Sequence, residues 1–345
     1  MPTQHRERNS GCRNNSNVWK SWTLKAFIGA ILIGATLIVG TACSTPLAAT
    51  ASSTPSAPRE DVITISTTEV PMPPPQEVSE TAMSPKRIIS LATGVGETVA
   101  ALGFGAQVVG RDETSNVPSI AGAEVVTKAH SVSAEKVLSL NPDLVIIDSS
   151  TSPPEAIDQI RSTGVKVVEV PEAWTLADIG PRTHAVADAL GVAPTVADRV
   201  VAESTGSGSS DQVTPAGVKV AFLYLRGTSA VYLIGGKGSG ADALIKATGY
   251  TDAGAAKGFD AFVPLTAEAV ATLDPDVILV MTKGLESVGG IDGLVGLPGV
   301  AQTKAGIARH VVAVDDTLLL SFGPRTGNLV QALGKAISET MNSRP

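Results

Sequence analysis

Short apolar runs alternate with helical patterns along the chain after residue 85. Strands are predicted at 87–91, 108–109, 165–170, 218–225, 231–236 and 310–316, and helices at 94–102, 241–248 and 327–341. Such alternation is typical of parallel sheets whose strands are connected by helices. The pattern therefore predicts an α/β fold.

One helix-and-strand unit occurs twice. Residues 133–147 read SAEKVLSLNPDLVII, and residues 266–280 read TAEAVATLDPDVILV. An Ala-rich segment at 181–205 lies between the copies, and its apolar positions recur at helical spacing. We therefore expect two similar lobes, 85–180 and 206–345, joined by one long helix, with a cleft between them. Clefts between lobes are common ligand sites.

The first 84 residues differ from the rest in composition. Residues 1–42 combine basic positions with the apolar run AFIGAILIGATLIVG, the plan of a signal peptide, and the alternative is an uncleaved membrane anchor. Cys43 follows the small Ala42 and resembles a bacterial lipobox cysteine, although Gly40 departs from the usual motif. Residues 43–84 are rich in Ser, Thr and Pro and predict a disordered stalk. We expect a palmitate-bearing lipoprotein on the outer face of the cytoplasmic membrane.

Charge and cysteine content narrow the function classes. The net charge is −7, and the leader contributes five basic residues and one acid, so the remainder is near −11. This balance argues against a nucleic-acid partner. Both cysteines lie within the first 43 residues, so no disulfide framework is expected in the body. The sequence lacks a G-x-S-x-G elbow and zinc-type histidine spacing, and we expect no enzyme.

Several motifs together resemble one family. They are 87–103, 108–118, 133–146, 222–227, 236–245, 265–280, 296–306 and 319–327. The chain resembles the iron-complex periplasmic binding proteins, which serve ABC importers of siderophores, corrinoids and haem. It is most similar to the haem-binding lipoproteins of Gram-positive bacteria. The resemblance implies a monomer that captures haem between its lobes and delivers it to a permease and its ATPase for iron transport. A carrier of a ferric siderophore or a corrinoid is the alternative.

His130 is the candidate iron ligand of the N-terminal lobe. It stands just before the first repeat copy, where the second copy has Val263. Ligands of parallel α/β sheets gather at the C-terminal ends of strands, where His130 is expected. A solvated loop histidine is the plain alternative. The resemblance implies an axial histidine at this place.

Tyr224 is the candidate ligand of the C-terminal lobe. Alternation along the strand at 218–225 places Tyr224 and Arg226 on one face at its end. A phenolate suits ferric iron, and a neighbouring guanidinium favours the ionised phenol. The resemblance implies this Tyr-x-Arg pair as ligand and support. Tyr232 is the fallback ligand.

Further residues complete the expected site. Met281 and Phe262, with Tyr232, are expected to line the pocket, and Arg111, Lys237 and Arg325 are the candidate contacts for haem propionates. The resemblance also implies one surface acid in each lobe for docking to the permease. Glu97 matches the first of these acids, and Asp242 is the nearest acid to the second.

Overall fold

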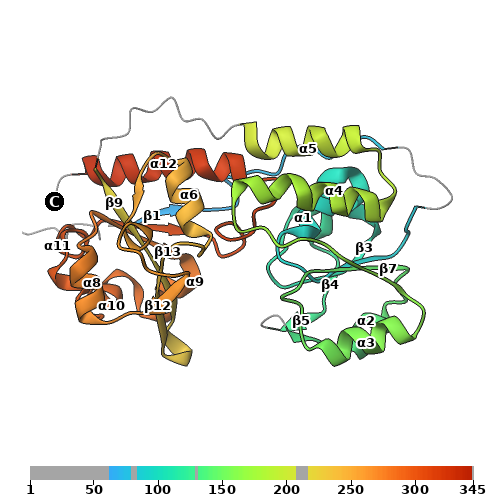
Figure 1. The fold of residues 1–345 in the computed structure, drawn as a ribbon, viewed down its shortest axis with the longest axis horizontal. Coiled ribbons are helices and arrows are strands. Elements are labelled where there is room, and N and C mark those ends of the chain that lie inside the picture. Colours follow the sequence, from blue (N-terminus) through green and yellow to red (C-terminus); the bar gives the residue numbers. More distant parts are fainter. Residues whose placement is uncertain (1–61, 79–83, 129–130, 207–216, 344–345) are drawn as a thin grey trace, which may run out of the picture. The chain divides into compact units, whose positions relative to one another are not determined.

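The computed structural model describes residues 62–78, 84–128, 131–206 and 217–343 (Figure 1). All of them belong to one compact unit that begins at Ala57. Among these residues, none of the helices is both long enough and apolar enough to cross a membrane. The predicted signal peptide and Cys43 lie outside the described residues.

The N-terminal lobe is built on a five-stranded parallel sheet in the order β4-β3-β2-β7-β8. Successive residues of β7 alternate between two hydrophobic cores, one on each face of the sheet. A sheet buried on both faces needs continuous apolar strands, as in the sequence LVII. The elements are β2 (Ile88–Ser90), α1 (Val95–Val99), β3 (Val108–Arg111), β4 (Glu124–Val125), β5 (Thr127–Lys128), β6 (Ser131–Val132), α2 (Ala134–Ser139), β7 (Leu144–Ile147), α3 (Pro154–Ser162) and β8 (Lys166–Glu169).

The C-terminal lobe contains a seven-stranded mixed sheet. Its main path is β1-β14-β13-β9-β10-β12, and β11 pairs with β9. Strand β10 runs antiparallel to both β9 and β12. The strands are β1 (Val62–Ile65), β9 (Lys219–Arg226), β10 (Val231–Gly235), β11 (Thr251–Asp252), β12 (Phe262–Pro264), β13 (Val277–Met281) and β14 (Val311–Val314). The helices are α6 (Ala241–Ala247), α7 (Ala253–Ala256), α8 (Ala267–Leu273), α9 (Thr282–Ser287), α10 (Gly290–Val295), α11 (Lys304–Ala308) and α12 (Thr326–Asn342).

The two repeat copies occupy matching places in the two sheets. The first forms α2 and β7, the second forms α8 and β13, and both strands lie beside the first strand of the repeated core, β2 or β9. Ser133 and Thr266 each cap their helix by accepting a backbone N–H three residues on, a role for which Ser and Thr are favoured. The α/β prediction with two similar lobes is confirmed.

The N-P-D and D-P-D segments of the repeat have structural roles. Asn141 and Asp274 both adopt left-handed backbone conformations, with φ of 47° and 39°. Asn and Asp tolerate this region better than most residues do. Asp143 and Asp276 then accept backbone N–H groups at the start of the neighbouring strand, from Lys86 at 2.8 Å and from residue 219 at 2.9 Å. The repeated unit is therefore scaffold.

The described part of the connection between the lobes, up to residue 206, contains two helices, so the prediction of one long helix at 181–205 is wrong. Helix α4 spans Ile179–Leu190, and α5 spans Pro194–Gly206. Gly191 ends α4 with φ of 73°, a left-handed conformation that glycine adopts at low cost. Pro194 then begins α5, a position that suits proline because its missing N–H is not needed there. The two helices pack against each other (Figure 1).

Residues 62–78, which we call the strap, belong to the folded body. Strand β1 pairs with β14 in the C-terminal lobe, and Val70 is fully buried in the core of that lobe. Farther on, the backbone N–H of Gln76 donates to the carbonyl oxygen of Ala101 at 2.8 Å, within the N-terminal lobe. The strap therefore contacts both lobes. The predicted stalk at 43–84 is wrong for these residues.

Candidate functional site

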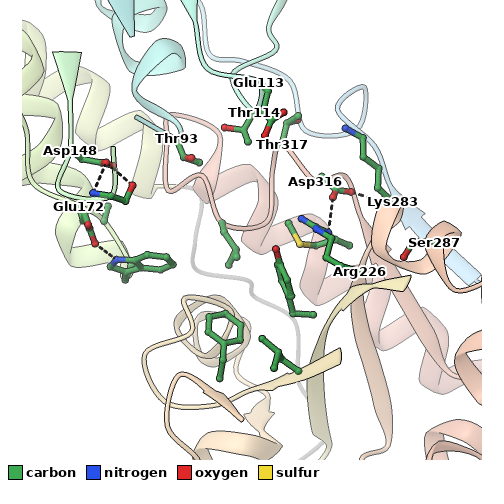
Figure 2. Close-up of a pocket in the computed structure, with 18 of the residues that line it drawn as sticks. Thr93, Glu113, Thr114, Asp148, Glu172, Arg226, Lys283, Ser287, Asp316 and Thr317 are labelled. Carbon is green, nitrogen blue, oxygen red and sulfur yellow. Dashed lines mark hydrogen bonds and ion pairs between the residues drawn. The ribbon is translucent and has the colours of Figure 1, made fainter. Parts of the chain in front are cut away.

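Residues of both lobes line a pocket of about 770 Å³. This volume is within the range of small-molecule sites in proteins. Figure 2 shows Asp148 and Glu172 on one side of the pocket and Arg226, Lys283 and Asp316 on the other. The lining also includes Ala173, Trp174, Tyr224, Leu233, Phe262, Met281 and Leu320. The pocket therefore combines an apolar wall with polar groups, in the cleft that the sequence predicts.

Tyr224 lies at the end of β9, on the wall contributed by the C-terminal lobe. Its half-buried ring makes an edge contact with Phe262, with centroids 5.8 Å apart and planes at 65°. The guanidinium carbon of Arg226 lies 4.5 Å from the centroid of the tyrosine ring. No described residue forms a hydrogen bond with the phenol oxygen of Tyr224. The pocket thus contains a phenol available to a ligand, with a cation stacked on its ring.

Arg226 is held by an acid of the loop that follows β14. Its Nη1 lies 3.7 Å from Oδ1 of Asp316, which follows β14. The other oxygen of Asp316 accepts the backbone N–H of Lys283 at 2.8 Å. Asp316 therefore ties the Arg226 side chain to the start of α9, and both cations lie on the same side of the pocket (Figure 2).

Two of the three predicted wall residues lie in the pocket lining, and the third does not. Met281 ends β13, and Phe262 begins β12; both line the pocket. Tyr232 pairs with Leu225 in the antiparallel β9–β10 ladder, and its ring packs against the core on the opposite face of the sheet. Alternation along β10 brings Leu233 to the pocket instead. The prediction for Tyr232 is therefore wrong.

The three predicted propionate contacts do not line the pocket. Arg111 is buried and donates to two backbone carbonyl oxygens of its own loop. Arg325 is buried and pairs with Glu97. Lys237 is exposed, on the turn between β10 and α6, outside the pocket lining. The assignments of Arg111 and Arg325 are wrong because both guanidiniums are buried and engaged by other groups, whereas the assignment of Lys237 stays a prediction that its position outside the lining does not support. The described cations of the lining are Arg182, Arg226 and Lys283.

Glu97 lies in the interior, so the prediction of a surface docking acid there is wrong. Its side chain is fully buried in α1, where Oε2 accepts from Nε of Arg325 at 3.0 Å and Oε1 accepts from Nη2. Burial raises the pKa of Glu97, and the charge of Arg325 opposes that shift. Arg325 immediately precedes α12, so this bidentate pair joins the two lobes.

Asp242, the other predicted docking acid, is engaged in its own turn. Its two oxygens accept the backbone N–H groups of Gly238 and Gly240, at 2.9 and 3.1 Å. The glycines of this turn thus shape the entry to α6, with the acid as an internal cap. Asp242 is half-buried. Its carboxylate stabilises the turn, and its assignment as a docking acid stays a prediction.

The repeat contains two exposed acids that the sequence analysis did not consider as docking candidates. Glu135 and Glu268 hold the same position in the two copies, in the first turns of α2 and α8, and both are exposed. The shared A-E pair of the repeat was the signal that could have identified them.

Arg182 of α4 was also missed, although it both lines the pocket and joins the lobes. Its Nη1 donates to the carbonyl oxygens of Thr93 at 2.9 Å and Ser321 at 3.1 Å. These acceptors belong to different lobes. Because burial removes the guanidinium from water, the pKa of Arg182 is lowered. The predicted ligand His130 lies outside the described residues.

Comparison with known proteins places the chain in a family. The family model described as "Periplasmic binding protein" matches residues 88–318. The apo haem-binding protein RhuT of Roseiflexus sp. RS-1 is 38% identical with a TM-score of 0.69, and the match covers 74% of this chain and 99% of that one.

Two further proteins similar to this chain support the same family. The haem-binding protein HmuT is 36% identical with a TM-score of 0.71, over 77% of this chain and 94% of that one. An uncharacterised ABC transporter substrate-binding lipoprotein of Bacillus subtilis, YvrC, is 27% identical over 73% of this chain and 80% of its own length. The chain therefore belongs to the periplasmic binding protein family.

Proposed function

We propose that this protein binds haem in the pocket between its lobes, outside the cytoplasm, and passes it to an ABC transporter for iron acquisition. The observation that carries the proposal is the Tyr224–Arg226 pair, with an unengaged phenol at an apolar wall. Relatives at 36% and 38% identity are described as haem-binding proteins. The proposed role is capture and delivery rather than catalysis.

Iron ligation is proposed from one residue of each lobe. Tyr224 would supply a phenolate oxygen to ferric iron, with Arg226 stabilising the negative charge. His130 would supply the second axial ligand from the N-terminal lobe. Solved variants of HmuT each replace one histidine, one tyrosine or one arginine by alanine, which are the three residue types proposed here. Phe262 and Met281 would pack on the macrocycle.

A haemin titration tests the function. Ferric haem added to the apoprotein is expected to give a shifted Soret band, and the shift should saturate at a defined ratio of haem to protein. The same titration with a corrinoid and with a ferric siderophore serves as the comparison. Saturable binding of either of these, together with no shift of the haemin spectrum, would show that the function is wrong.

Docking to the permease is proposed through Glu135 and Glu268, one exposed carboxylate in each lobe at equivalent positions. Charges at the rim of an interface chiefly steer association and set its specificity. Replacing both glutamates by alanine is expected to slow haem uptake at least about tenfold while leaving haem binding unchanged. The measurements are growth on haemin as the iron source and the haemin titration of the purified variant.

A matched control for the docking pair uses two other exposed acids, Glu155 of α3 and Glu286 of α9. The double alanine variant at these positions removes the same net charge. Equal loss of uptake in both double variants would assign the effect to overall charge and contradict the docking assignment.

Attachment to the membrane is proposed through a lipid on Cys43. The B. subtilis relative is described as a lipoprotein. Cys43→Ser is expected to move the protein from the membrane fraction to the soluble fraction and to abolish labelling with a palmitate analogue. Retention of the variant in membranes would favour an uncleaved N-terminal anchor instead.

A further inference from the structure

The polar groups of the pocket are distributed unevenly between its two sides. Figure 2 shows Asp148 and Glu172, both of the N-terminal lobe, on the side opposite Lys283 and Arg226. Glu172 accepts a hydrogen bond from Nε1 of Trp174 at 2.7 Å and a second from the hydroxyl of Ser149. These bonds lower the pKa of Glu172, so it stays ionised near neutral pH. Arg182 is the one described cation near these two acids, and it is almost fully buried, so their side of the pocket presents carboxylates to a ligand.

Two of the three described cations of the pocket already have partners. Arg182 donates to carbonyl oxygens of both lobes, at 2.9 and 3.1 Å, and is almost fully buried. Arg226 pairs with Asp316 and stacks on the ring of Tyr224. The Arg182 guanidinium cannot turn to a ligand carboxylate without giving up its carbonyl partners, and the Arg226 guanidinium is shared between Asp316 and the tyrosine ring.

Lys283 is the remaining cation. Its backbone is fixed by the hydrogen bond from its N–H to Asp316, while its side chain is exposed at the pocket. Its ammonium has no hydrogen-bond or ion-pair partner among the described residues. An ammonium on a four-carbon stem is a mobile point charge, suited to following a flexible carboxylate.

We propose that Lys283 binds a carboxylate of the ligand and thereby sets its orientation, with the acidic edge of the molecule toward α9 and away from Asp148 and Glu172. This inference rests on the proposed function, in which the ligand is a haem that carries two propionates. The pocket then distinguishes a planar macrocycle with carboxylates on one edge from an uncharged one of the same shape.

Titrating the full-length protein in mild detergent with two probes tests this proposal. The probes are haemin and haemin dimethyl ester, whose carboxylates are masked while its iron and ring are retained. Lys283→Ala is expected to weaken haemin binding about fivefold, the size of one exposed ion pair, and to leave ester binding unchanged. Lys283→Arg should restore haemin binding because the charge is kept. Raising the salt concentration should narrow the gap between the unchanged protein and Lys283→Ala.

Lys237→Ala is the matched control, because Lys237 is also an exposed lysine of the C-terminal lobe but lies outside the pocket lining. It should bind both probes as the unchanged protein does. Unaltered haemin affinity in Lys283→Ala, or equal losses for haemin and its ester, would overturn the orientation proposal while the proposed function stands. Failure of the unchanged protein to bind either probe would instead overturn the proposed function and this inference with it.

Discussion

Replacing Tyr224 by phenylalanine is expected to weaken haem binding by at least about a hundredfold. Even residues that only support a metal ligand cost about 10- to 100-fold in metal affinity when they are changed, so loss of the ligand itself should cost no less. The substitution removes one oxygen and keeps the ring, so the edge contact with Phe262 and the stacking of Arg226 are retained. The measurement is a haemin titration followed at the Soret band and at the phenolate-to-iron charge-transfer band.

Tyr232→Phe is the control for this substitution. It makes the same chemical change at the residue next to Leu233 of the pocket lining, on the opposite face of the β9–β10 pair. Its spectrum and affinity should equal those of the unchanged protein. A Tyr224→Phe variant that keeps the charge-transfer band would contradict ligation by Tyr224, and loss of that band in Tyr232→Phe would assign the ligand to the other strand.

Replacing Glu97 by alanine is expected to lower the free energy of unfolding by about 3–5 kcal/mol. The substitution leaves the Arg325 guanidinium buried without its carboxylate, because both side chains are almost completely inaccessible to water. Breaking one half of such a pair costs more than the pair itself contributes, since the remaining charge cannot be solvated. Chemical denaturation followed by circular dichroism measures the change.

The double variant Glu97→Leu with Arg325→Met separates the charge effect from packing. It removes both charges and keeps apolar volume, so most of the lost stability should return. A double variant as unstable as Glu97→Ala would mean that the ion pair is not the source of the loss. Glu135→Ala, which removes an exposed carboxylate from the same lobe, should change stability by less than about 0.5 kcal/mol.

Most of the fold could be predicted because its signals are local. Apolar runs predicted β2, β3, β8, β9, β10 and β14 within two residues at each end, and the repeat indicated two matching lobes. The break between α4 and α5 was missed because apolar residues at helical spacing look the same in one long helix and in two helices that run in opposite directions. Val186 and Val200 are both buried, as the stripe predicts, although Gly191 reverses the chain between them.

The strap and the polar pairs could not be found in this way. The abundance of Ser, Thr and Pro at 43–84 concealed the short β-branched run of β1, which becomes a strand only because β14 offers an open edge. From the sequence alone, Glu97 was interpreted as a surface acid. Its partner Arg325 is distant in the sequence, and only the fold brings the two side chains together. Long-range charge pairing leaves no mark on periodicity, so the assignments of Glu97 to docking and of Arg325 to a propionate failed for the same reason.

The strap shortens the segment that would connect a membrane anchor to the folded binding protein. If a lipid is attached at Cys43, residues 44–61 are all that separate the anchor from β1, instead of residues 44–84. Whatever their conformation, 18 residues reach at most about 65 Å, compared with about 150 Å for 41 residues. A shorter connecting segment confines the haem-loaded protein to a smaller volume above the membrane and raises its effective concentration at the permease. Delivery would then depend on the density of transporters within that radius rather than on free diffusion.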